Sequence, residues 1–128
     1  MYKSVWYNSL TKPVFAPPDW LFTPAWMLLY LLIFISLIVY ITSEGENKKS
    51  GYIYFAIQII LNFIWSPVFF LLKNIFLAFV VILLLDIFVI LTIKKFYSVS
   101  KIAAWLLIPY LVWILYATYL NLGYFVLN

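Results

Sequence analysis

Asn74 to Ile93 reads NIFLAFVVILLLDIFVILTI, twenty residues in which Asp86 is the single charged side chain. A helix of about 20 apolar residues crosses the roughly 30 Å of hydrocarbon in a bilayer. The run lacks the polar alternation of a barrel strand, so it predicts a membrane-spanning helix. Three further stretches have the same character, namely 21–42, 52–72 and 102–127. The predicted fold is all-α, a bundle of four transmembrane helices that forms one domain over residues 1–128.

The composition of the whole chain agrees with lipid as its solvent. Of 128 residues, 68% are hydrophobic and 9% are charged, whereas a soluble domain has about 45–50% and about 25%. A chain this short cannot bury so much apolar surface in water. Soluble enzymes are therefore excluded. The net charge of +4 comes from scattered lysines and forms no basic patch for nucleic acid. We expect a multi-pass integral membrane protein in contact with lipid, in the cell membrane if the source is prokaryotic.

Two residue types are absent, and each absence removes a class of chemistry. The chain has no Cys and no His. No disulfide, thiolate nucleophile, imidazole base or His-type metal site can therefore form. We predict no metal site and no required cofactor.

The predicted connections are short. Residues 43–51 (SEGENKKSG) form a polar loop, Lys73-Asn74 forms a tight turn, and 94–101 (KKFYSVSK) links the last two helices. Short connections favour an up-down-up-down bundle. Pro24 is expected in a first helical turn, and Pro67 and Pro109 inside helices. Five lysines lie in the two longer connections and three elsewhere, which favours a cytoplasmic side for those connections.

Polar residues inside the spans are the informative ones, because each is costly in lipid unless it is paired or useful. Gln58 and Asn62 are four residues apart and share a helix face, with Trp65 one turn further. They make either interhelical hydrogen bonds or a pair of amides that line a ligand cavity. Asp86 is either a proton or cation site, or a carboxyl that is protonated or paired near the helix end. A small proton-coupled transporter that uses Asp86 is the alternative function.

Aromatic residues make up 23% of the chain. Trp26 and Tyr30 share one predicted helix stripe, and Tyr110, Trp113 and Ala117 share another. An interfacial belt accounts for aromatic residues near span ends, but Trp113 falls near the middle of its span. Mid-depth tryptophans beside amides suit a flat, apolar ligand with a few polar edges, because rings stack and amides orient.

Three blocks of sequence resemble one known family. They are Trp6–Tyr30 (WYNSLTKPVFAPPDWLFTPAWMLLY), Gln58–Phe70 (QIILNFIWSPVFF) and Ala104–Asn121 (AWLLIPYLVWILYATYLN). They are similar, in this order, to the TspO/MBR family of tryptophan-rich sensory proteins and translocator proteins. The resemblance implies a membrane protein that binds tetrapyrroles such as protoporphyrin, for their sensing, transport or light-dependent breakdown. A homodimer is one implied state.

The resemblance also implies roles for individual residues. Trp26 and Trp113 match pocket tryptophans that are tied to porphyrin breakdown in light, and they are the sole catalytic candidates. The remaining matched positions are two amides, two residues of a covering loop and two neighbours of Trp113, namely Gln58, Asn62, Tyr7, Pro17, Ala117 and Leu120. The helix faces described above add three further ligand-binding candidates. Tyr30 and Tyr110 come from the aromatic stripes, and Trp65 comes from the face of Gln58 and Asn62. A porphyrin is the expected ligand.

Two departures from the family pattern affect these expectations. The family usually has five membrane helices, one of them before the Trp-Tyr block, whereas this chain begins five residues before Trp6. We therefore expect the first helix to be missing from this sequence. The sequence is then a natural short form, the product of a start codon assigned too late, or a protein that a partner completes, and its site is expected to be open on one side. Asp86 has no counterpart in the family pattern.

Overall fold

The computed structural model describes residues 19–46, 48–70 and 72–127. Four helices occupy this part of the chain: α2 (Asp19–Thr42), α3 (Lys48–Phe70), α4 (Ile75–Val99) and α5 (Lys101–Leu127). Each is long and apolar enough to cross a membrane. The prediction of an all-α membrane bundle with four spanning helices is therefore confirmed for the described residues.

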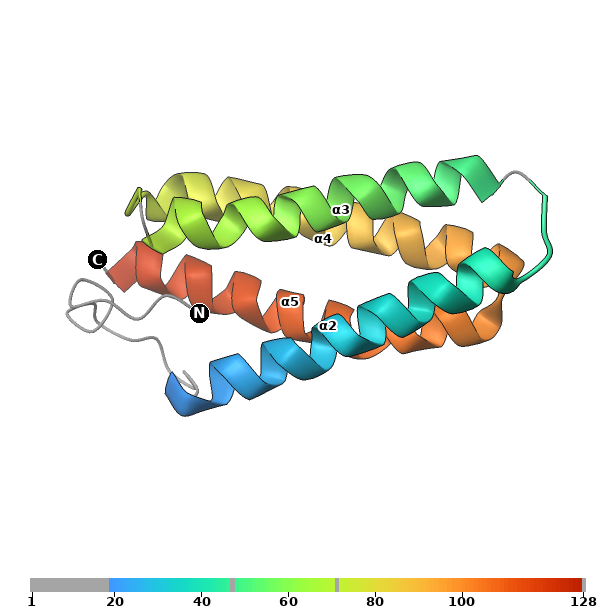
Figure 1. Cartoon of the computed structure of the whole chain (residues 1–128). Helices are drawn as coiled ribbons and strands as arrows, with labels where there is room; N and C mark the ends of the chain where they lie inside the picture. Colours follow the sequence, from blue (N-terminus) through green and yellow to red (C-terminus); the bar gives the residue numbers. More distant parts are fainter. Residues whose placement is uncertain (1–18, 47, 71, 128) are drawn as a thin grey trace.

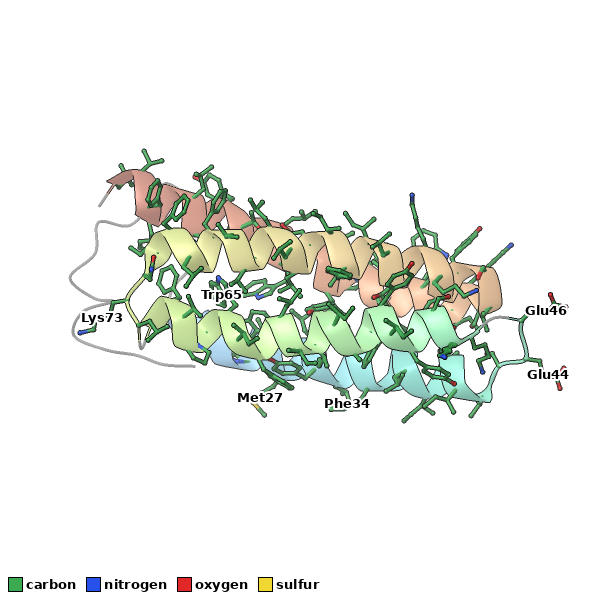
Figure 2. All side chains as sticks on the ribbon, turned by 90° about the horizontal axis from the view of Figure 1, so that it is seen from above. Met27, Phe34, Glu44, Glu46, Trp65 and Lys73 are labelled. Carbon is green, nitrogen blue, oxygen red and sulfur yellow. The ribbon has the colours of Figure 1, made fainter. Side chains whose placement is uncertain are left out.

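Consecutive helices run in opposite directions, as short connections predict (Figure 1). α2 packs on α5, α5 on α4, and α4 on α3. Glu44 and Glu46 lie at one end of the bundle and Lys73 lies at the other (Figure 2). Met27 and Phe34 point outward (Figure 2) and are more than half exposed. Apolar side chains can face outward in this way because lipid, rather than water, covers the helices.

The predicted linker at 94–101 is wrong. α4 continues through it to Val99, and a single residue, Ser100, separates α4 from α5. Phe96 gives the physical reason: its side chain is fully buried and stacks on Tyr40 with ring centroids 4.0 Å apart. This contact with α2 stabilises six further helical residues, 94–99, which local polarity did not predict. Asp86 consequently lies near the middle of its helix.

The predicted loop at 43–51 is also too long, because α3 already begins at Lys48. The Lys48 ammonium donates to the backbone carbonyls of Ile41 (3.0 Å) and Ser43 (2.7 Å). A cation at the carbonyl end of a helix interacts favourably with the helix dipole. Polar residues that predicted a loop thus belong to a helix end and its cap.

The predicted tight turn between α3 and α4 is confirmed. Lys73 adopts a φ of 55°, in the left-handed region that reverses the chain direction. Asn74 then caps α4, because its side-chain oxygen accepts a hydrogen bond from Leu77 N at 3.0 Å. At the other end of the chain, α2 begins at Asp19, so Pro24 lies in its second turn rather than its first.

Candidate functional site

Two tyrosines and two amides form one chain of hydrogen bonds across three helices. Tyr30 Oη on α2 donates to Asn62 Oδ1 on α3. Asn62 Nδ2 donates to Tyr110 Oη on α5 at 2.8 Å. Tyr110 Oη donates to Gln58 Oε1, also at 2.8 Å. We call these four residues the amide–tyrosine chain.

Because these side chains are buried, the loss of one of their hydrogen bonds is costly in free energy. Tyr110 is 0% exposed and Gln58 is 1% exposed, where no water can replace a lost partner. Gln58 Nε2, at the end of the chain, has no hydrogen-bond partner among the described residues. Of the two interpretations of Gln58 and Asn62, interhelical hydrogen bonding is what the structure displays. The other amide atoms are already engaged by tyrosines.

An aromatic cluster adjoins the amide–tyrosine chain through Tyr30. The Tyr30 ring lies 5.7 Å from the Trp26 ring, centroid to centroid. Trp26 meets Trp113 of α5 edge to face at 6.2 Å and 88°, a favoured geometry for aromatic pairs. Trp113 in turn contacts Tyr116 at 5.8 Å. Asn62 therefore helps to position Tyr30 against the tryptophan pair.

A groove lies beside this aromatic cluster, between α2 and α5. Its volume is about 310 Å³. Leu28 and Val112 on its rim are 57% and 61% exposed, so the groove opens toward lipid. The lining is almost wholly apolar and consists of Ala25, Leu28, Leu29, Pro109, Val112, Trp113 and Tyr116.

Sequence reasoning missed most of this lining. Tyr116 could have been found, because it lies three residues after Trp113 and hence on the same face. A second hollow, of about 420 Å³, lies under the α3–α4 turn beside Lys73 and Asn74. It is at the far end of α3 from the α2–α3 loop and includes none of the predicted site residues.

Three other predicted site residues belong to the packed interior. Trp65 points into the bundle (Figure 2), and its indole Nε1 donates to Asn121 Oδ1 at 2.9 Å. Asn121 Nδ2 donates to the carbonyl of Ile75 at 3.0 Å, so Trp65 and Asn121 join α3, α5 and α4. Ala117 and Leu120 are both buried in α5. Tyr7 and Pro17, predicted to cover the site, lie outside the described residues.

Asp86 lies between α4 and α5. Its Oδ2 is 2.7 Å from Thr118 Oγ1, and it lines neither of the two hollows just described. Nothing in these contacts favours the alternative of a transporter with a carboxyl facing a water-filled path. Within the described ranges, no group of three or more acidic, His or Cys residues could hold a metal ion.

Four apolar helices around a buried amide–tyrosine chain, with a tryptophan pair beside a lipid-facing groove, define a small multi-pass membrane protein. Sequence comparison identifies the family to which this membrane protein belongs. The profile of the TspO/MBR family matches residues 1–127, and the chain belongs to that family.

Relatives of the chain occur in very different organisms. The chain is 48% identical to tryptophan-rich protein TspO of Archaeoglobus fulgidus, over 96% of this chain and 80% of that protein. It is 37% identical to protein CrtK of Rhodobacter capsulatus, over 96% and 78% of the two chains. It is 36% identical to the translocator protein of Homo sapiens, over 91% and 70%.

Proposed function

We propose that the protein binds a flat, largely apolar ring ligand of the tetrapyrrole class, in the groove between α2 and α5. The observation that carries the proposal is the edge-to-face Trp26–Trp113 pair beside a groove to which Trp113 contributes. A ring ligand can lie against the exposed part of Trp113 and Tyr116. Ligand pockets have volumes of about 300–1,000 Å³, so this groove would hold part of a porphyrin and leave the rest in lipid.

An iron-free porphyrin fits this chain better than haem does. Haem iron is held most often by His or by a Cys thiolate, and the sequence contains neither residue. The groove instead offers apolar and aromatic surface, which suits the faces of the macrocycle. Two relatives, one from Cereibacter sphaeroides and one from Homo sapiens, are named tryptophan-rich sensory protein and translocator protein. These names support a role in sensing or moving such a ligand, in the cell membrane if the source is prokaryotic.

In this proposal the amide–tyrosine chain acts on the ligand through the tryptophans. Asn62 holds the hydroxyl of Tyr30, and Tyr30 packs against Trp26. Trp26, once held in place, in turn holds the Trp113 ring through their edge-to-face contact. Asn62 and Gln58 are thus positioning residues, and ligand affinity depends on them through ring geometry.

Light-dependent breakdown would be chemistry of the porphyrin itself. The excited porphyrin accepts one electron from an indole, which leaves a porphyrin radical anion and a tryptophan radical cation. Trp113 is the indole that lines the groove, and Trp26 is in contact with it. No conventional catalytic acid, base or nucleophile is part of this proposal.

Porphyrin titration of Trp113→Phe and Trp26→Phe tests the proposal. An aromatic pair of this kind contributes about 0.5–1.5 kcal/mol, so we expect affinity to fall about 2- to 10-fold and photobleaching of bound porphyrin to slow. Trp105→Phe is the matched control, because Trp105 is exposed on α5 and does not line the groove. Unchanged binding and unchanged bleaching in both Trp113→Phe and Trp26→Phe would contradict the site.

A further inference from the structure

Asp86 is a buried acid that the proposed function does not use. It is 7% exposed and lies near the middle of α4, which spans Ile75–Val99. Its Oδ2 contacts Thr118 Oγ1 on α5 at 2.7 Å. Its Oδ1 is buried and has no hydrogen-bond partner among the described residues. The carboxyl is therefore held at one oxygen, at the depth of the membrane where water is scarcest.

The hydrogen bonds of Thr118 indicate the protonation state of this carboxyl. Thr118 Oγ1 lies 2.7 Å from Asp86 Oδ2 and also 2.7 Å from the carbonyl oxygen of Ile114. A hydroxyl has one hydrogen, whereas an ionised carboxylate and a carbonyl both only accept. One hydrogen cannot serve both contacts fully. If Asp86 is protonated, its O–H donates to Thr118 Oγ1, and Thr118 donates to Ile114, so both short contacts are satisfied.

The charged groups around Asp86 also indicate that its carboxyl is protonated. The lysines in the described part of the chain lie in the connections or near helix ends, at 48, 49, 73, 94, 95 and 101. Lys94 and Lys95 follow Asp86 on α4 by about two helical turns. The other titratable groups on the neighbouring spans α3 and α5 are tyrosines, of which Tyr110 already donates to Gln58. No cation in these described spans is placed to compensate a carboxylate in hydrocarbon, which is a costly state.

We propose that Asp86 is a proton-binding site that keeps its proton in the membrane, and that the neutral carboxyl ties α4 to α5 by donating to Thr118. This tie does not depend on a porphyrin or on the groove. It places a carboxylic acid proton near the middle of α4, in a hydrogen bond between α4 and α5.

Infrared spectroscopy of the full chain in lipid bilayers at neutral pH tests the proposal. We expect the C=O stretching band of a protonated carboxylic acid in the wild type and its complete loss in Asp86→Asn. The amide that this variant introduces can still donate to Thr118, so helix content measured by circular dichroism should be unchanged. Glu44→Gln and Glu46→Gln should keep the band, since both glutamates are exposed on the α2–α3 loop.

Two further variants test the partner. Thr118→Val removes the acceptor, so the band should persist but move to the higher frequency of a free acid. Thr118→Ser should leave the band where it is. A wild type without the band, or a band that survives in Asp86→Asn, would overturn the proton site. A band that Thr118→Val leaves unshifted would overturn the tie between α4 and α5.

Discussion

Asn62→Leu is expected to lower the free energy of unfolding by about 1–2 kcal/mol and to loosen the tryptophan pair. The variant removes the acceptor of Tyr30 Oη and the donor to Tyr110 Oη. A buried polar group left without a partner costs about 1–3 kcal/mol, and interhelical hydrogen bonds in membranes contribute about 0.6 kcal/mol on average. Two lost bonds, one of them at the fully buried Tyr110, give the stated range. Unfolding by SDS in mixed micelles, followed by circular dichroism, measures it.

Tyr30→Phe is the matched control for this prediction. It deletes the hydroxyl together with its bond and retains the ring, so it should cost less than Asn62→Leu. In the double variant the two changes should be less than additive, because both remove the same Tyr30–Asn62 bond. Strict additivity, or an Asn62→Leu variant as stable as the wild type, would show that the amide–tyrosine chain does not hold the bundle together.

Gly51→Ala is expected to destabilise the protein by about 1–2 kcal/mol, although alanine is the better helix former. A Cβ at position 51 would lie 2.7 Å from Tyr40 Cζ and 3.1 Å from Lys95 Cγ. Tyr40 cannot easily move away, because its ring stacks on Phe96 and its hydroxyl donates to the Lys48 carbonyl at 2.9 Å. Overpacking typically costs about 1–3 kcal/mol, and the helix propensity of alanine returns about 1 kcal/mol or less at a helix end.

A double-mutant cycle with Tyr40→Phe locates the source of this effect. The phenol oxygen is the atom closest to the added methyl group, so its removal should relieve part of the strain. Cζ remains close, so the relief should be incomplete. SDS unfolding of the four variants gives the coupling free energy. A Gly51→Ala protein at least as stable as the wild type would contradict the close contact between α3 and Tyr40.

The helices could be predicted from the sequence, whereas two of their boundaries could not. The run from Asn74 to Ile93 needs no tertiary information, because lipid requires every backbone group to bond within the helix. The last turn of α4 depends on Phe96, which is buried against Tyr40 of α2. A contact between residues so distant in sequence leaves no local signal at 94–101, where the lysines are typical of a loop.

The candidate site could likewise be predicted only in part from the sequence. Helical spacing placed Gln58 and Asn62 on one face, and the structure brings them together with Tyr30 and Tyr110. Spacing could not show that the tyrosines would engage these amides. The groove was not predictable either, because rim residues such as Leu28 and Val112 are the same residue types that cover any lipid-facing helix.

The most direct test of the central claim, that a porphyrin binds in the groove between α2 and α5, is a porphyrin titration of Ala25→Trp. Ala25 lines the groove, and an indole at this position would fill much of it. Ala56→Trp is the matched control, because Ala56 is exposed on α3, outside the groove lining. We predict that Ala25→Trp weakens binding by about tenfold or more, equivalent to at least about 1.4 kcal/mol, while Ala56→Trp binds as the wild type does. Wild-type affinity in Ala25→Trp would contradict the account.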